Sequence, residues 1–91
     1  MPDELVKFSL GHVVITPNAL ATLAPEDVQL ALCRHHCGDW GEVCPEDRAE
    51  NEFSLKRDLR LLSAYRSKGL KFWIITEADR SATTILMPED Y

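Results

Sequence analysis

Apolar and β-branched residues gather in three short runs toward the C-terminal end of the chain, at residues 59–66, 71–77 and 82–87. Turn-forming segments separate these runs, so the pattern predicts three strands joined as an antiparallel meander. Strict alternation in the middle run places Phe72, Ile74 and Thr76 on one face of the predicted sheet.

The N-terminal half predicts one further extended segment and three helices. Residues 6–15 are extended in pattern, with Gly11 marking a bulge or a tight turn. Thr16 supplies a capping hydroxyl, and a proline opens each helical segment, where its missing N–H is not needed. Gly38 is the natural stop of the second helix. The predicted helices cover residues 18–23, 25–37 and 46–57.

These elements predict an α+β domain that covers residues 1–91. Two or three short helices are expected to pack on one face of a three- to four-stranded antiparallel sheet, with the meander at its C-terminal end. A chain of 91 residues holds a single core and buries roughly 60–65% of its unfolded surface. Such a domain is only modestly stable by itself, so a dimer is left open.

The charge distribution is uneven, although the chain as a whole carries a net charge of −5. Residues 1–55 hold ten acidic and three basic side chains, whereas residues 56–80 hold seven basic and three acidic ones. A basic face is therefore conceivable, but overall acidity disfavours nucleic acid as a partner. The sequence has no apolar run that would span a membrane and no signal-peptide pattern, so a cytoplasmic protein is expected.

The three cysteines, Cys33, Cys37 and Cys44, are expected to be free thiols in a reducing compartment. Two histidines lie between them, but structural zinc sites usually draw their ligands from two separate knuckles, and this chain has one. We therefore expect no metal and no cofactor.

One polar segment is harder to explain by folding alone. Residues 34–41 read Arg-His-His-Cys-Gly-Asp-Trp-Gly, so that two glycines bracket an Asp-Trp pair directly after the second helix. Further on stand Ser-Ala-Tyr at 63–65, the run Trp-Ile-Ile-Thr-Glu-Ala-Asp-Arg-Ser at 73–81 and Thr-Thr-Ile-Leu at 83–86.

Together these motifs resemble a family of small bacterial proteins that is common on plasmids and integrated elements and has no assigned activity. The resemblance covers nearly the whole chain. The family pattern contains one histidine, which corresponds to His35, and does not require Cys33 or Cys37. The resemblance implies an accessory protein of a mobile element and no particular reaction.

Two classes of function follow. The first is a small binding or interaction domain without chemistry, whose partner is a protein or a small ligand. Its expected ligand-binding residues are Asp39, Trp40, Ser63 and Thr84. An acidic protein that mimics nucleic acid is a separate, weaker alternative that rests only on the acids of the third helix.

The second class is a metal-independent ribonuclease, because helices followed by a meander resemble the barnase and RelE-like toxins in outline. Its catalytic residues would be His35 for proton transfer, Arg80 for charge stabilisation and Tyr65 for positioning the phosphate. These side chains would have to converge on a cleft between helix and sheet. The structural alternative is a buried, hydrogen-bonded His35, a Trp40 that packs in the core and an Asp39 that caps a turn.

Overall fold

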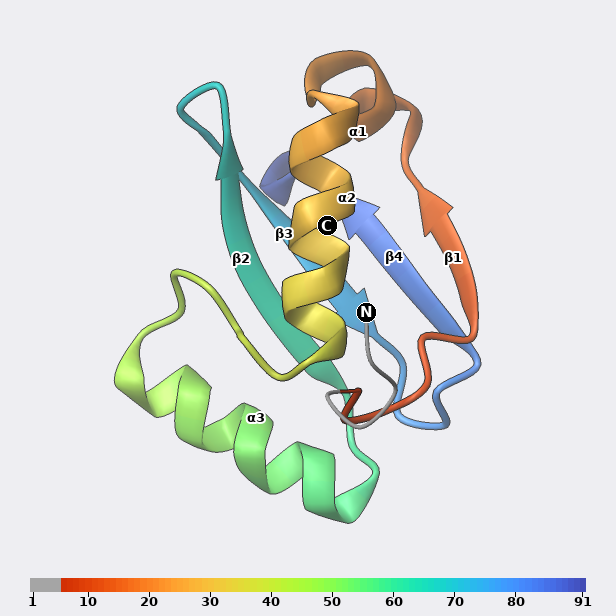
Figure 1. Cartoon of the computed structure of the whole chain (residues 1–91), viewed down its shortest axis with the longest axis vertical. Coiled ribbons are helices and arrows are strands. Elements are labelled where there is room, and N and C mark those ends of the chain that lie inside the picture. Colours follow the sequence, from red (N-terminus) through yellow and green to blue (C-terminus); the bar gives the residue numbers. More distant parts are fainter. Residues whose placement is uncertain (1–5) are drawn as a thin grey trace.

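The computed structural model describes residues 6–91 and contains three helices and a four-stranded sheet (Figure 1), so the predicted α+β class is confirmed. The helices are α1 (Pro17–Thr22), α2 (Pro25–His36) and α3 (Pro45–Arg57). The strands are β1 (His12–Ile15), β2 (Leu61–Ser67), β3 (Leu70–Thr76) and β4 (Ala82–Leu86), and a short 3-10 turn, η2 (Pro88–Asp90), follows them.

The sheet has the strand order β1-β4-β3-β2. The predicted meander is confirmed, since β2 pairs antiparallel with β3 and β3 antiparallel with β4. The N-terminal strand departs from the prediction in two ways: it covers four residues, and it pairs parallel with β4, which makes the sheet mixed. The reason is the connection, because the chain passes through all three helices and two strands before it returns beside β1.

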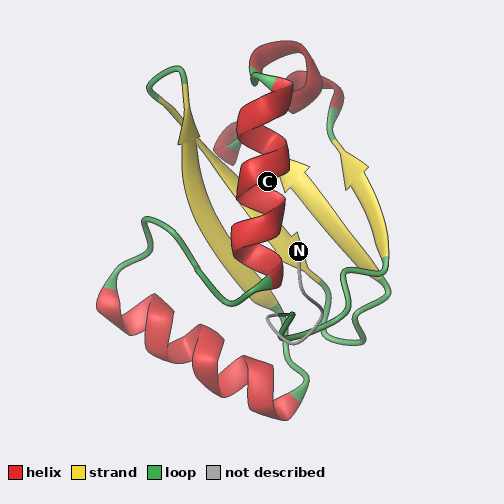
Figure 2. Cartoon of the chain, in the orientation of Figure 1, coloured by secondary structure: helices red, strands yellow, loops and turns green. Residues whose placement is uncertain are grey.

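The helices begin as their sequences indicate. Pro17, Pro25 and Pro45 each stand at the first helical position, and the Thr16 hydroxyl accepts a hydrogen bond from the Ala19 N–H at 3.2 Å. Helix α2 crosses one face of the sheet, whereas α3 lies beside β2 (Figure 2). Within the described residues, no helix combines the length and apolar composition needed to cross a membrane.

The core lies between α2 and the sheet face that it covers, called here the inner face. Phe72, Ile74 and Thr76 are all fully buried, which confirms the predicted facing of β3. Ile85 of β4 pairs with Ile74 and packs in the same cluster, with small residues of the helices above it. The inner face is thus held mainly by aliphatic and aromatic contacts.

Replacing Ile74 by alanine is expected to lower the free energy of unfolding by about 2–4 kcal/mol, because Ile74 is 0% exposed at the centre of the sheet. Lys68→Ala, in the exposed β2–β3 turn, serves as the control and should leave stability nearly unchanged. Urea titration of both variants checks the prediction. Equal losses would contradict the assigned core.

Candidate functional site

His35 lies inside the core, at the last turn of α2 over the inner face, and is 0% exposed. Its Nδ1 is within hydrogen-bond distance of the Ser63 hydroxyl, and its Nε2 lies 2.8 Å from the Thr76 hydroxyl. Thr76 in turn contacts the hydroxyl of Thr83, which donates to the carbonyl oxygen of Leu10 at 2.7 Å. A buried chain of hydrogen bonds therefore joins α2, three strands and the segment before β1.

The donor and acceptor directions of these hydrogen bonds determine which imidazole nitrogen of His35 carries the proton. Because Thr83 donates its single proton to Leu10, it must accept from Thr76, and Thr76 must then accept from the Nε2–H of His35. Nδ1 is left as the acceptor of the Ser63 hydroxyl proton. Burial, together with the charges of His36 and Arg80, lowers the pKa of His35 to about 3. His35 is consequently a neutral structural group, and no substrate can reach it in this conformation.

Tyr65, expected as a catalytic residue, is also committed to the fold. It lies on the inner face of β2, 2% exposed, and its hydroxyl donates to the backbone carbonyl of Asp39. The guanidinium of Arg34 lies over its ring, 4.9 Å from the centroid. Burial raises the pKa of the Tyr65 hydroxyl, so it does not ionise near neutral pH.

The Asp-Trp pair between the two glycines shapes the loop that follows α2. The Asp39 carboxylate accepts from Arg34 at 2.8 Å and from the Gly41 N–H, and the Arg34 contact holds the pKa of that carboxyl below its ordinary value. Trp40 is 3% exposed and its indole N–H donates to Glu52 of α3 at 2.7 Å. Asp39 therefore stabilises a turn and Trp40 packs in the core, as the structural alternative predicted.

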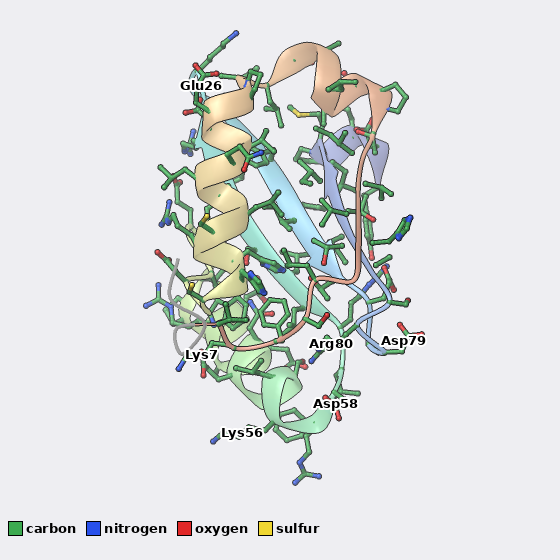
Figure 3. All side chains as sticks on the ribbon, turned by 45° about the vertical axis from the view of Figure 1, so that its right-hand side comes forward. Lys7, Glu26, Lys56, Asp58, Asp79 and Arg80 are labelled. Atoms are coloured by element: carbon green, nitrogen blue, oxygen red, sulfur yellow. The ribbon has the colours of Figure 1, made fainter. Side chains whose placement is uncertain are left out.

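Arg80 joins α3, the segment before β2 and the β3–β4 turn through hydrogen bonds. It lies in the β3–β4 turn at the end of the sheet, close to the C-terminal end of α3 (Figure 3). Its guanidinium donates to the carbonyl oxygens of Ser54, Leu59, Glu77 and Ala78. Nη1 and Nη2 thus hold the turn against the end of α3 and the segment before β2, a structural role rather than that of an oxyanion site.

The expected cleft is therefore not formed. His35, Ser63 and Tyr65 are buried on the inner face, Asp39 and Trp40 order a loop, and Arg80 closes one end of the sheet. Thr84 lies beside Ile75 in the sheet register, on the opposite face from Ser63. The cleft is absent for one physical reason. Each polar group close to the core forms an internal hydrogen bond, because buried polar groups are almost always hydrogen-bonded.

Two of the surface hollows formed by the described residues are considered as candidate sites. One, of about 440 Å³, lies over β2 and β3 on the face opposite the inner face and has charged groups of both signs in its wall, among them Glu42, Asp47 and Lys71. Glu42 is already paired with Arg66 at 2.8 Å. This hollow has a mixed lining that favours no particular ligand charge.

The other hollow, of about 240 Å³, is an apolar groove between β1 and the helices α1 and α2, and is called here the β1 groove. It is lined by Val13, Val14, Ile15, Leu20, Leu23, Pro25, Val28, Gln29, Leu32 and Ile85. None of these side chains is charged. Val13 and Val14 are each 45% exposed and Leu20 is 67% exposed, so a substantial apolar surface faces solvent here.

The sequence predicts only an extended segment at residues 6–15 and does not indicate the β1 groove. The signal was present as a β-branched run, Val13 to Ile15, that lacks the charged residues which usually protect an outer strand. It was not decisive, because the sequence does not tell which strand forms the edge of a sheet.

No metal centre is assembled in the part of the chain that the structure describes. No three side chains of His, Cys, Asp or Glu are grouped there as ligands would be. Cys33, Cys37 and Cys44 are not joined in disulfides. The exposed thiol of Cys44 has a raised pKa: an N–H contact from Asp47 favours the thiolate, but contacts with the Glu46 and Asp47 side chains outweigh it.

Comparison with known proteins adds no assignment. No family model matches the chain, and no curated protein or solved structure matches it either.

Proposed function

We propose that this protein is a non-catalytic interaction domain, an accessory protein of the plasmid or mobile-element kind that acts in a bacterial cytoplasm. The observation that carries the proposal is the contrast between two sets of residues. The polar side chains suited to chemistry are engaged in internal hydrogen bonds, whereas the β1 groove leaves apolar side chains exposed beside an edge strand.

The partner of such a surface is an extended polypeptide segment that adds to β1 as a further strand. In this mode of recognition, backbone hydrogen bonds to the edge strand supply affinity, and alternate side chains enter an adjoining groove. Strand β1 offers both parts: a free edge within residues 6–91 and an apolar groove next to it. Because the groove has no charged side chain, the segment it fits has apolar residues at alternate positions.

The ribonuclease alternative receives no comparable support. It needs a histidine that reaches the substrate and changes its protonation near neutral pH. His35 is 0% exposed and its pKa is lowered to about 3. Incubation of the protein with single-stranded RNA should therefore give no cleavage above that of a His35→Ala control. Cleavage that depends on His35 would overturn the proposed function.

Panning of a library of short extended peptides on the immobilised protein tests the binding surface. We expect enrichment of peptides with alternating apolar residues, and roughly tenfold or greater loss of their binding to Val13→Pro. Proline at this position removes an N–H that points away from the sheet, so the internal pairing of β1 with β4 is retained.

The matched control is Leu30→Ala, since Leu30 is an apolar side chain of α2, 63% exposed, that does not line the β1 groove. It should bind the enriched peptides as the wild type does. Peptides that bind Val13→Pro as well as the wild type would place the interaction elsewhere and contradict the proposal.

A further inference from the structure

The two edges of the sheet are finished in different ways. The outer edge of β2 is closed, because the Asn51 side chain of α3 donates to the Leu62 carbonyl at 2.7 Å and accepts from the Leu62 N–H at 3.0 Å. Two residues further along, Ala64 bonds the backbone of Trp40 and Glu42. At the other edge, no strand of residues 6–91 lies beyond β1 (Figure 1).

Of the features that usually protect an edge strand, β1 has only its short length of four residues. Natural edge strands discourage pairing with lysine, proline, bulges or a covering helix. The four residues of β1 include no charge and no proline, and Val13 and Val14 are each 45% exposed. We propose that β1 pairs antiparallel with β1 of a second copy of this chain, which joins the two sheets into one of eight strands. This inference rests on the proposed function and names the partner strand.

The charges of the protein favour a second copy over other partners. A two-fold contact places the same surface on both sides, so any charge near the axis would face its own copy. The chain has a net charge of −5, yet the residues of the β1 groove have none. A surface built for a basic or acidic partner would instead present the opposite charge. The uncharged strip at β1 is what a self-complementary contact requires.

The hydrogen-bond pattern of β1 selects one register. The N–H groups of His12 and Thr16 donate to the carbonyl oxygens of Ser81 and Ile85, on the β4 side. The backbone groups of the alternate residues, Val13 and Ile15, therefore point away from the sheet. Pairing Val13 with Ile15 of the second copy satisfies all the outward groups of these residues and forms four hydrogen bonds. A shift in one direction would oppose Val13 to Pro17, which has no N–H to donate.

In this register the two-fold axis passes through Val14, and the ends of the strands meet in a complementary way. His12 of one copy lies opposite Thr16 of the other, on the outer face of the sheet. The Thr16 hydroxyl donates to the Asp90 carboxylate at 2.7 Å, so an acidic group lies next to the exposed imidazole of the second copy. A histidine and a carboxylate therefore approach each other at both ends of the contact.

Disulfide trapping tests the register directly. Val14→Cys, in a background where the three native cysteines are serine, places two thiols at a non-hydrogen-bonded antiparallel pair, where Cα atoms are about 4.5 Å apart. This separation lies within the range for a disulfide, so mild oxidation should form the covalent dimer roughly tenfold faster than in the Leu30→Cys control. Equal rates for the two variants would overturn the proposed register.

Sedimentation equilibrium of the unmodified protein, from micromolar to millimolar concentration, gives the second readout. We expect a reversible dimer, and dissociation at least roughly tenfold easier in Val14→Lys, because two ammonium groups would be held close together at the axis. Leu30→Lys should dimerise as the wild type does. Circular dichroism of both variants verifies folding.

A wild-type protein that stays monomeric at every concentration would overturn the dimer. If that monomer still binds peptides in a manner that Val13→Pro abolishes, the proposed interaction function stands and only the identity of the partner is wrong. If the protein neither dimerises nor binds peptides in this way, the proposed interaction function is wrong as well.

Discussion

Acidification from about pH 7 to about pH 4 is expected to lower the free energy of unfolding by roughly 3–3.5 kcal/mol, because His35 is buried in its neutral form. Its pKa is about 3 in the folded protein, whereas the ordinary value is 6.5. The unfolded chain therefore takes up a proton first as the pH falls. Stability is complete above about pH 6.5 and declines between that value and about pH 3.

The expected size of the effect follows from the linkage relation. Each pH unit in this interval costs about 1.4 kcal/mol, and the whole interval costs on the order of 4–5 kcal/mol. Native domains have about 5–15 kcal/mol of total stability, so this loss is at least about a third of the total. The buried hydrogen-bond chain explains the cost, since a protonated Nδ1 could no longer accept from Ser63.

Urea denaturation at successive pH values measures this dependence. The interval above about pH 5 isolates His35, because carboxyls such as Asp39, whose pKa is lowered by Arg34, lose their contribution only below it. His35→Gln should be less stable at neutral pH and nearly flat across the interval. Lys68→Ala, in the exposed β2–β3 turn, should keep the wild-type slope. A flat wild-type profile would refute the assignment of His35 as a neutral core group.

Gly41→Ala is expected to lower the free energy of unfolding by about 3 kcal/mol or more, since it combines backbone strain with overpacking. Gly41 has a φ of +73°, and a Cβ there would lie 2.0 Å from the Ala64 carbonyl oxygen and 2.7 Å from the Tyr65 ring. The clash occurs where the backbone of residues 40–42 forms hydrogen bonds with the outer edge of β2. The edge would have to open to admit the methyl group.

Gly69→Ala is a matched control for this variant. Gly69 has a similar φ of +79°, but no atom lies within 4 Å of a Cβ placed there. It should show only the backbone strain, about 1–2 kcal/mol. The difference between the two variants in chemical denaturation therefore measures the close approach of the loop to β2. Similar losses would show that the loop relaxes and that Gly41 serves only the turn.

The sequence by itself determined the local elements of this protein. Alternation of Phe72, Ile74 and Thr76 fixed the facing of β3, and the threonine cap and first-position prolines fixed where helices begin, because these signals act over a few residues. The α+β class followed from the order of these elements. The burial of His35 was one of two readings that the sequence left open.

Only the tertiary structure decided how distant segments meet. His35 lies 28 residues from Ser63 and 41 from Thr76 along the chain, so nothing in its neighbourhood revealed that both hydroxyls would surround it. The same is true of the parallel pairing of β1 with β4, which depends on the path of the intervening chain. Sheet order also made β1 an open edge and β2 a closed one, and this non-local outcome moved the candidate site from the polar motif to the β1 groove.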